Sequence, residues 1–280
     1  MKFTGTKDYV ATEDLKVAVN AAIVLERPLL VKGEPGTGKT VLAEEVAKAI
    51  GAPLLTWHIK STTKAQQGLY EYDAVSRLRD SQLGDARVSD ISNYIKRGKL
   101  WEAFTHAKRP VLLIDEIDKA DEEFEAFLLE ILSDHQVTIP EIGTVHAIVP
   151  PIVLLTSNAT RDLGDAMKRR CLHLHIGFPD AKLEERIVDA RIPGIRDSLR
   201  RQIVSFVQQL RALDLRKLPS VSETIDWARA LLLMNATRLD PAVVHDTLNV
   251  LMKFEGDMQL AGKSVAEFAQ KARREAGLVD

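Results

Sequence analysis

The apolar positions of this chain follow one pattern up to about residue 179 and a different pattern after it. In the first part, short continuous apolar runs alternate with segments of helical spacing, which is typical of buried strands connected by helices. We interpret five runs as strands: 29–31, 54–59, 111–114, 152–156 and 171–176. The spacing predicts helices at 41–50, 121–133 and 161–170. The first part is therefore predicted to be an α/β block.

After Phe178 and Pro179 the strand pattern stops, and only helical spacing remains. Ser220 and Glu223 form a capping-box pattern at the start of one of these segments. The helices predicted in this part are 183–189, 199–213, 222–234, 241–254 and 265–276. We therefore expect two domains, an α/β core over residues 1–179 and an all-helical domain over residues 180–280.

Two segments of the first part depart from the alternation of strands and helices. Residues 61–90 are polar and lack a clean period, but they include aromatic and aliphatic residues, so we favour a functional insertion over a disordered linker. Residues 136–142 and 145–149 are separated by Gly143 and Thr144, which predicts a β-hairpin with a glycine turn.

A glycine-rich segment directly after the first predicted strand carries a phosphate-binding pattern, G-x-x-x-x-G-K-T. A predicted helix follows it, so main-chain N–H groups and the helix dipole would converge on an anion. We expect the Lys39 ammonium to reach the β- and γ-phosphates of a nucleotide and the Thr40 hydroxyl to be a ligand of Mg²⁺. The predicted nucleotide-binding residues are Gly33, Glu34, Pro35, Gly36, Thr37, Gly38, Lys39 and Thr40.

Two carboxylates follow the buried run 111–114. Asp115 and Glu116 fall at the C-terminal end of this predicted strand, where ligands bind in open α/β sheets. We expect Asp115 to hold Mg²⁺ directly or through water, and Glu116 to be the general base that polarises the attacking water. Asn158, at the tip of the run 152–156, is predicted to orient that water or to contact the γ-phosphate.

Composition narrows the classes of protein that fit. Hydrophobic residues make up 45% and charged residues 28% of the 280 residues, which is ordinary for a globular protein with an apolar core. The formal net charge of -2 disfavours a nucleic-acid partner that needs a strongly basic face. Cys171 is the single cysteine, so a cytoplasmic location fits and an intramolecular disulfide is excluded. The sequence has no run of about 20 apolar residues and no apolar signal-peptide core, which leaves only peripheral association with a membrane.

The phosphate-binding segment, the acidic strand end and the polar strand tip occur in a fixed order, with a predicted hairpin before the last of them and a helical block after it. This arrangement resembles an AAA+ ATPase. Within that superfamily, residues 33–40 and the sequence LIDEIDKA at 113–120 are most similar to the MoxR group. Residues 64–80 and 220–231 resemble the MoxR-type ATPases of carbon monoxide dehydrogenase maturation, the CoxD-like subgroup.

The resemblance implies a P-loop NTPase fold with a five-stranded parallel sheet, an insertion at the second helix, a hairpin before the polar strand, and an all-helical lid domain. It implies ATP as the nucleotide and a homo-oligomeric ring, usually a hexamer, with both inserted segments facing the central pore. A neighbouring subunit in such a ring supplies an arginine finger that stabilises charge on the transferred phosphoryl group. Arg170 matches the position of this finger best, and Arg169 is the alternative; for both, a surface salt bridge is the simpler interpretation.

The MoxR resemblance also implies a biological role. Such ATPases act as chaperones that remodel or mature a metalloenzyme, here carbon monoxide dehydrogenase or a related molybdenum hydroxylase, together with a partner that carries a von Willebrand factor A domain. The sequence departs from many AAA+ lids, because Ser222 or Glu223 stands where a nucleotide-sensing arginine is common, and Arg229 lies further along that helix. For adenine contacts, residues 9–11 are the candidates, with Val10 at their centre.

Three other functions share parts of this pattern. A nucleic-acid motor, such as a helicase or a restriction-type translocase, has the same combination of insertion and hairpin, but the mild acidity of the chain disfavours it. A GTP-dependent switch is disfavoured because the guanine signature N-K-x-D does not occur. A small-molecule kinase is disfavoured because the pair Asp115 and Glu116, together with a helical lid, favours hydrolysis over transfer to a substrate hydroxyl.

Overall fold

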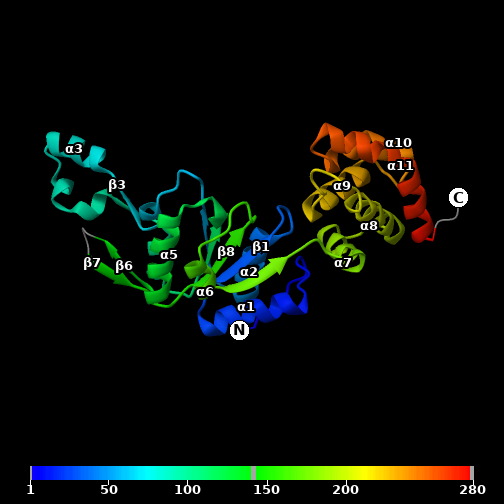
Figure 1. Ribbon diagram of the computed structural model, residues 1–280. Coiled ribbons are helices and arrows are strands. Elements are labelled where there is room, and N and C mark those ends of the chain that lie inside the picture. Colours follow the sequence, from blue (N-terminus) through cyan, green and yellow to red (C-terminus); the bar gives the residue numbers. More distant parts are fainter. Residues whose placement is uncertain (1, 140–142, 278–280) are drawn as a thin grey trace. The chain divides into compact units, whose positions relative to one another are not determined.

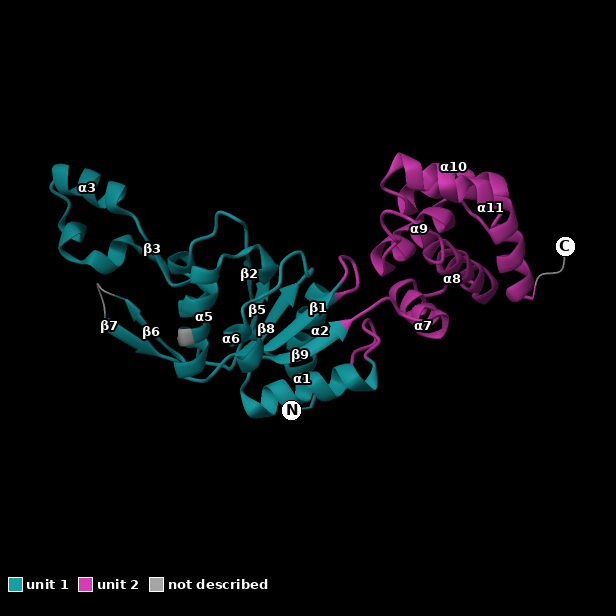
Figure 2. Ribbon diagram, viewed as in Figure 1, with its two compact units in different colours: residues 1–4, 12–33, 39–175 teal, residues 5–11, 34–38, 176–280 magenta. Residues whose placement is uncertain are grey.

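The computed structural model describes residues 2–139 and 143–277 and contains two compact units (Figure 2). Unit 1 comprises residues 1–4, 12–33 and 39–175, and unit 2 comprises residues 5–11, 34–38 and 176–280. Each unit has its own hydrophobic core, which is what an independent compact body requires.

Unit 1 is built on a five-stranded parallel sheet (Figure 1), as predicted. Its strands are β1 (Leu29–Gly33), β2 (Leu54–His58), β5 (Val111–Asp115), β8 (Ile152–Ser157) and β9 (Leu172–Ile176), in the spatial order β2-β5-β8-β1-β9. The central strands β1, β5 and β8 are almost entirely buried, which explains their continuous apolar runs. The edge strand β2 is half-buried along most of its length. The other edge strand, β9, alternates between half-buried and exposed positions.

Outside the insertion after β2, the α-helices of unit 1 are α1 (Glu13–Leu25), α2 (Lys39–Ile50), α4 (Lys99–Phe104), α5 (Glu122–Asp134) and α6 (Asp165–Arg170). The helix predicted at 161–170 is wrong over its first four residues, because α6 begins only at Asp165. The Arg161 guanidinium donates to the carbonyl of Ala120 and to the buried carboxylate of Glu125, and the Gly164 N–H donates to that same carboxylate. These long-range bonds hold residues 161–164 in an irregular conformation.

The insertion after β2 is a small folded body that extends beyond the predicted range 61–90. Its antiparallel strands β3 (Tyr70–Tyr72) and β4 (Ile95–Arg97) pair with each other, so the insertion closes only after residue 90. Between these strands lies α3 (Ala74–Gln82), followed by the 3-10 turns η2 (Ala86–Ser89) and η3 (Ile91–Tyr94). Another 3-10 turn, η1 (Ala65–Gly68), precedes β3.

The hairpin before β8 is formed by β6 (Gln136–Ile139) and β7 (Gly143–His146). Gly143 pairs with Ile139 and Thr144 pairs with Thr138, so both residues belong to a strand and the turn predicted at this position is wrong. Residues 140–142, which connect the two strands and were expected to belong to the first strand, lie outside the described residues.

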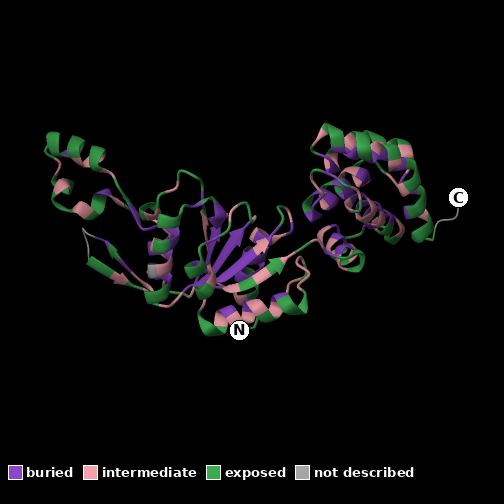
Figure 3. Ribbon diagram, in the orientation of Figure 1, coloured by how far each residue is buried: buried purple, intermediate pink, exposed green. Residues whose placement is uncertain are grey.

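Unit 2 contains the helices α7 (Ala181–Arg191), α8 (Asp197–Arg211), α9 (Val221–Leu233), α10 (Pro241–Leu251) and α11 (Glu255–Glu275). The apolar face of α8 is buried against Trp227 of α9, and the inward faces of these helices are buried in Figure 3. α11 begins ten residues before the predicted start at 265, because Phe254 has the extended backbone of a helix N-cap. Within the described ranges, no helix is both long and apolar enough to cross a membrane.

Candidate active site

The C-terminal ends of three central strands gather the predicted polar residues of unit 1. β1 leads into the phosphate-binding segment that precedes Lys39, β5 ends at Asp115, and Asn158 follows β8 directly. The strands are parallel neighbours, so their carboxyl ends meet at one edge of the sheet. The cluster at this edge is what the sequence predicted for the two carboxylates and the amide.

Lys39 is buried, with 6% of its surface exposed, and its Nζ donates to the carbonyl of Gly33 at 2.8 Å. The ammonium is therefore held at the mouth of the segment to which it belongs. An ammonium held at this place, beside the first residue of the segment, fits a polyphosphate, whose oxygens would accept charge-assisted hydrogen bonds from it.

Asp115 is 8% exposed and has no Lys or Arg among its hydrogen-bond partners in the described structure. Its Oδ1 accepts hydrogen bonds from the hydroxyls of Thr40 at 3.1 Å and Thr156 at 2.5 Å. Its Oδ2 lies 3.1 Å from Nδ1 of His58, which stands opposite Asp115 in the register of β2 and β5. Hydroxyl donors do not cancel a carboxylate charge, so Thr40 and Asp115 are suited to share a divalent cation with phosphate oxygens.

Thr156 is a functional candidate that the sequence analysis did not identify. It is 2% exposed; its Oγ1 donates to Asp115 and accepts from the main-chain N–H of Glu116 at 2.9 Å. Glu116 has φ 62° and ψ 46°, a left-handed conformation that is disfavoured for residues other than glycine. One buried hydroxyl therefore positions both carboxylates. In the sequence, the signal that could have identified Thr156 is a threonine at the end of the otherwise apolar run 152–156.

The Glu116 side chain is held between two donors. Its Oε1 accepts from Nδ2 of Asn158 at 3.2 Å, and its Oε2 accepts from the ammonium of Lys119. The structure therefore brings together Glu116 and Asn158, as expected for a base and a residue that orients water. Lys119 was not predicted; its hydrogen bond to Glu116 raises the pKa of Lys119, against the opposing effect of burial.

Asp118 orders the loop that carries Asn158, and it was also missed from the sequence. Its carboxylate accepts from the main-chain N–H of Asn158 at 3.3 Å, and from the main-chain N–H and hydroxyl of Thr160 at 3.1 and 2.6 Å. Burial acts to raise the pKa of Asp118, but the hydrogen bonds from Thr160 and Asn158 outweigh it, so the pKa lies below its ordinary value. The Asp118 carboxylate therefore fixes the position of the backbone that follows β8.

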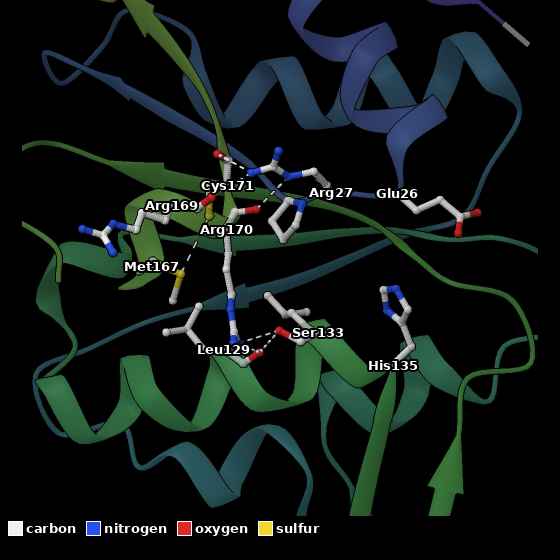
Figure 4. A pocket seen from close by; sticks show the side chains of 11 residues that line it. Glu26, Arg27, Leu129, Ser133, His135, Met167, Arg169, Arg170 and Cys171 are labelled. Carbon is white, nitrogen blue, oxygen red and sulfur yellow. Dashed lines mark hydrogen bonds between the residues drawn. The ribbon is translucent and has the colours of Figure 1, made fainter. Parts of the chain in front are cut away.

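Arg169 and Arg170 do not belong to this cluster. They end α6 just before β9, and the start of a parallel strand lies at the opposite edge of the sheet from the strand ends that carry Asp115. Arg170 Nη1 donates to the carbonyl of Leu129 at 3.2 Å and to Oγ of Ser133 at 2.6 Å. The side chain of Arg169 is exposed and points away from these two residues (Figure 4).

A cavity of about 500 Å³ lies beside these arginines (Figure 4). Arg27 in its wall donates to the carbonyls of Arg169 at 2.8 Å and Arg170 at 3.1 Å, so its charge caps the C-terminus of α6. Cys171 also lines the cavity; burial raises the pKa of its thiol to about 12, so the thiol stays protonated at neutral pH. Cys171 is therefore a small residue of the hydrophobic core.

The middle of the phosphate-binding segment, residues 34–38, belongs to unit 2. Gly36 and Gly38 have φ of +76° and +89°, and a Cβ on Gly36 would lie 2.3 Å from Oγ of Ser220. Only glycine fits at residue 36, because both the backbone conformation and this close approach exclude a side chain. The carbonyl of Gly36 accepts from the N–H and the hydroxyl of Ser222 at 3.1 and 3.2 Å.

The start of α9 therefore presents a serine, not a cation, to Gly36. Glu223 closes the predicted capping box with Ser220 and forms an ion pair with Lys217 at 3.3 Å. Burial acts to raise the pKa of Glu223, and the hydrogen bonds from Ser220, together with the charge of Lys217, hold it below its ordinary value. Arg229 forms an exposed pair with Asp226 at 3.5 Å.

The residues expected near adenine lie in the segment 5–11 of unit 2. The Tyr9 hydroxyl donates to the carbonyl of Gly38 at 3.5 Å, and its ring would contact a Cβ placed on that glycine. Val10, the residue that we selected, is half-buried in the same segment. Tyr9 is therefore the member of the trio for which the structure shows a contact with the phosphate-binding segment.

Comparisons with known proteins agree with this geometry. The family model described as "AAA domain (dynein-related subfamily)" matches residues 28–171, just over half of the chain. The chain is 26% identical over 267 residues to "Lon protease homolog, mitochondrial 1" of Dictyostelium discoideum, covering 84% of this chain but only 26% of that protein. It is 25% identical over 216 residues to an uncharacterized protein of Staphylococcus aureus (strain USA300), covering 74% of this chain and 76% of that protein.

Solved structures of Thermotoga maritima RuvB have a similar fold. One RuvB mutant superposes with a TM-score of 0.55 at 18% sequence identity, covering 100% of this chain and 87% of that chain. A RuvB described as a Holliday junction branch migration motor gives a TM-score of 0.52 at 17% identity, covering 95% and 80%. Identity at this level shows a shared fold alone. The family match over residues 28–171 and the observed sheet order together place this chain in the dynein-related AAA domain family, and it is an AAA+ ATPase.

Proposed function

We propose that this chain hydrolyses ATP to ADP and phosphate in an oligomeric ring and uses the resulting motion to remodel a partner protein. The observation that supports hydrolysis most directly is the pair of adjacent carboxylates at the end of β5. Among the described residues, the side chain of Asp115 has only hydroxyl and imidazole partners, whereas Glu116 lies within hydrogen-bond reach of Asn158. One carboxylate is suited to a cation and the other to a water molecule.

In the proposed mechanism, the main-chain amides of residues 33–40 and the Lys39 ammonium bind the phosphates. Thr40 and Asp115 would hold Mg²⁺, which would neutralise charge on the phosphates. Asn158 orients the attacking water through its amide, and Glu116 accepts the proton from that water. The Thr156 hydroxyl positions both acids, because it donates to the carboxylate of Asp115 and accepts from the main-chain N–H of Glu116. These roles use the side chains where the structure already holds them.

An arginine from a second copy completes the proposed site. Arg169 and Arg170 lie at the sheet edge opposite their own chain's carboxylates, so either would act on the nucleotide of a neighbouring copy. Arg170 matches the family position for such a finger, but it is bonded to Leu129 and Ser133 of α5. Arg169 is exposed at the same helix end. A ring of six copies is the assembly that we expect.

Mixing of variants tests the shared site. Arg170→Ala and Glu116→Gln chains are each expected to be nearly inactive alone. In mixed rings, the intact Arg170 of one copy would meet the intact Glu116 of another, and ATP turnover would partly return. The same mixture with Arg169→Ala decides between the two arginines. Turnover that stays absent in both mixtures, although the chains co-assemble, would contradict a finger supplied by the neighbour.

The general base is tested by Glu116→Gln, which keeps the shape of the side chain but removes its basicity. We expect ATP turnover to fall by about 10²-fold or more, with ATP binding retained. Glu122→Gln, an exposed change at the start of α5, is the matched control and should leave turnover unchanged. Wild-type turnover in Glu116→Gln would remove Glu116 from this role.

We also propose the finer role implied by the sequence. The core of residues 1–179 and the helical lid of residues 180–280 would form a cytoplasmic chaperone of the MoxR type that matures carbon monoxide dehydrogenase or a related molybdenum hydroxylase. The support is the resemblance of residues 64–80 and 220–231 to that subgroup. Co-purification with a von Willebrand factor A protein, and the loss of active metalloenzyme in cells carrying Glu116→Gln, are the expected results.

A nucleic-acid motor is the second candidate, because one structural neighbour, at 17% identity, is described as a Holliday junction branch migration motor. Binding to DNA that falls steeply as salt rises would favour this function. We expect weak or no such binding, since acidic and basic residues are nearly balanced, 40 against 38.

A further inference from the structure

Helix α3 of the insertion has its polar and apolar faces reversed. Asp80 is only 4% exposed, whereas Val75 is 80% and Leu78 is 63% exposed. Val75 and Leu78 are one helical turn apart on the same face, and Leu83, at 76% exposed, follows at the end of the helix. A surface helix of a globular protein normally buries its aliphatic side chains and exposes its carboxylates. Here aliphatic side chains of α3 face solvent, and most of this helix is exposed in Figure 3.

Hydrogen bonds inside the insertion hold this reversed orientation. The Asp80 carboxylate accepts from the hydroxyl of Tyr94 at 3.0 Å and from the guanidinium groups of Arg79 at 3.3 Å and Arg87 at 3.4 Å. Asp73 caps the start of α3 by accepting from the N–H of Ser76 at 2.9 Å. A rotation of α3 that buried Val75 and Leu78 would break the bonds to Asp80. The outward face is therefore part of the folded insertion.

No part of the described chain covers this face. Val75, Leu78 and Leu83 belong to neither hydrophobic core, and Figure 1 places α3 at the far end of unit 1, beyond α5. Nucleic acid does not fit, because residues 70–97 carry five acidic and five basic side chains and Asp80 is already paired with arginines. The chemistry of the face points to an apolar segment of a protein.

The size of the face favours a transient contact. Three aliphatic side chains present at most a few hundred Å². A stable complex needs about 800 Å² on each partner, so one such patch cannot hold a permanent partner or a second copy. In a ring, several copies would contact the same polypeptide, and weak individual contacts would add up through effective concentration. Weak and repeated apolar contacts suit a protein that is held only briefly.

We propose that the outward face of α3, formed by Val75, Leu78 and Leu83, binds apolar segments of unfolded or locally unfolded client polypeptides. The inference rests on the proposed remodelling function and assigns a surface to its client. This client-binding surface is distinct from the proposed site of hydrolysis, because its residues contact none of the nucleotide-binding side chains described above.

The test compares two sets of serine substitutions in the full chain. Val75→Ser, Leu78→Ser and Leu83→Ser remove the face on α3. Val17→Ser, Val24→Ser and Leu25→Ser remove similarly exposed aliphatic groups from α1, at 67%, 79% and 56% exposure, and serve as the control. The probe is fluorescein-labelled, reduced and carboxymethylated α-lactalbumin, a permanently unfolded chain, and its binding is followed by fluorescence anisotropy. ATP turnover and sedimentation velocity are measured on the same samples.

We expect the α3 variant to bind the probe at least about tenfold more weakly than wild type, and the α1 variant to stay within about twofold. Turnover and assembly should be unchanged in the α3 variant. Undiminished probe binding overturns the proposal, and so does a loss of assembly with probe binding retained, since a second copy would then cover the face. If the α3 set impairs folding, Leu78→Lys alone must still weaken binding. If the wild-type chain shows no ATP turnover but the α3 variant still binds the probe more weakly than wild type, the proposed ATP hydrolysis is refuted and the assignment of the α3 face to client binding stands.

Discussion

Asp115 at the strand ends and Asp80 in the insertion are both buried carboxylates, 8% and 4% exposed, but their partners differ in charge. Asp80 is bonded by the guanidinium groups of Arg79 and Arg87, which neutralise it. Asp115 is bonded by two hydroxyls and an imidazole. Hydroxyl groups stabilise a carboxylate without cancelling its charge, so Asp115 retains the capacity to bind a cation. The charge of its partners thus indicates whether a buried acid has a structural role, as Asp80 has, or is suited to bind a cation, as Asp115 is.

The strongest test of this contrast replaces each carboxylate by an amide. Asp115→Asn should lower Mg²⁺-dependent ATP turnover by about 10²-fold or more, because the cation loses a charged ligand. Asp80→Asn should leave turnover within about twofold, since its charge serves only the insertion. Steady-state turnover over a range of Mg²⁺ concentrations measures both. Equal losses in the two variants would remove the distinction.

A second test concerns the Thr156 hydroxyl, which is bonded to Asp115 and to the main-chain N–H of Glu116. Thr156→Val keeps the shape of the side chain but removes the donor to Asp115 and the acceptor for Glu116 N–H. The loss of such buried bonds costs about 1–3 kcal/mol, so we expect kcat to fall by roughly 10- to 10²-fold while KM for ATP changes little. Thr156→Ser retains the hydroxyl and should stay within about threefold of wild type. A fully active valine variant would show that Thr156 does not position the carboxylates.

A third test asks whether Asp80 holds the insertion together. Its replacement by asparagine removes charge-assisted bonds to Arg79 and Arg87. Protection of the amides between residues 74 and 94 against hydrogen exchange should fall by about tenfold. Amides of the central strands β5 and β8 provide the internal reference and should not change. Uniform loss of protection across unit 1 would contradict a local role.

The smallest expected effect is a pH dependence at Asp118, whose pKa in the folded state lies below its ordinary value of 3.8. The unfolded chain therefore takes up the proton first as pH falls. The stabilisation from Asp118 is fully present above the unfolded value and is lost as pH falls through the lower, folded value. Its size should be about 1 kcal/mol or less, because the desolvation of the buried carboxylate offsets much of the effect of its hydrogen bonds. Urea unfolding between pH 6 and 3 should show a smaller pH dependence in Asp118→Asn than in wild type.

Sequence reasoning succeeded where the signal is local. The five apolar runs depend on spacing within a few residues, and the observed strands match them. The nucleotide-binding role of residues 33–40 and the roles of Asp115 and Glu116 stay predictions. Sequence reasoning failed at residues 161–164, where charges suggested a helix but long-range bonds to Glu125 prevent one. It also failed at Gly143, where strand pairing overrides a turn preference.

The sequence by itself determined where the strands lie, where the glycine-rich phosphate-binding pattern follows the first strand, and where two acids follow a buried strand, because covalent spacing and hydrophobic period are properties of neighbouring residues. The tertiary structure alone decided which partner each acid meets. Strand register brings Thr156 and His58 to Asp115, and the closing of the insertion brings Tyr94 to Asp80. Those contacts join residues that are far apart along the chain, and no local pattern specifies them. The outward direction of Val75 and Leu78 follows from the same cause, since it is the burial of Asp80 that turns the aliphatic face of α3 to solvent.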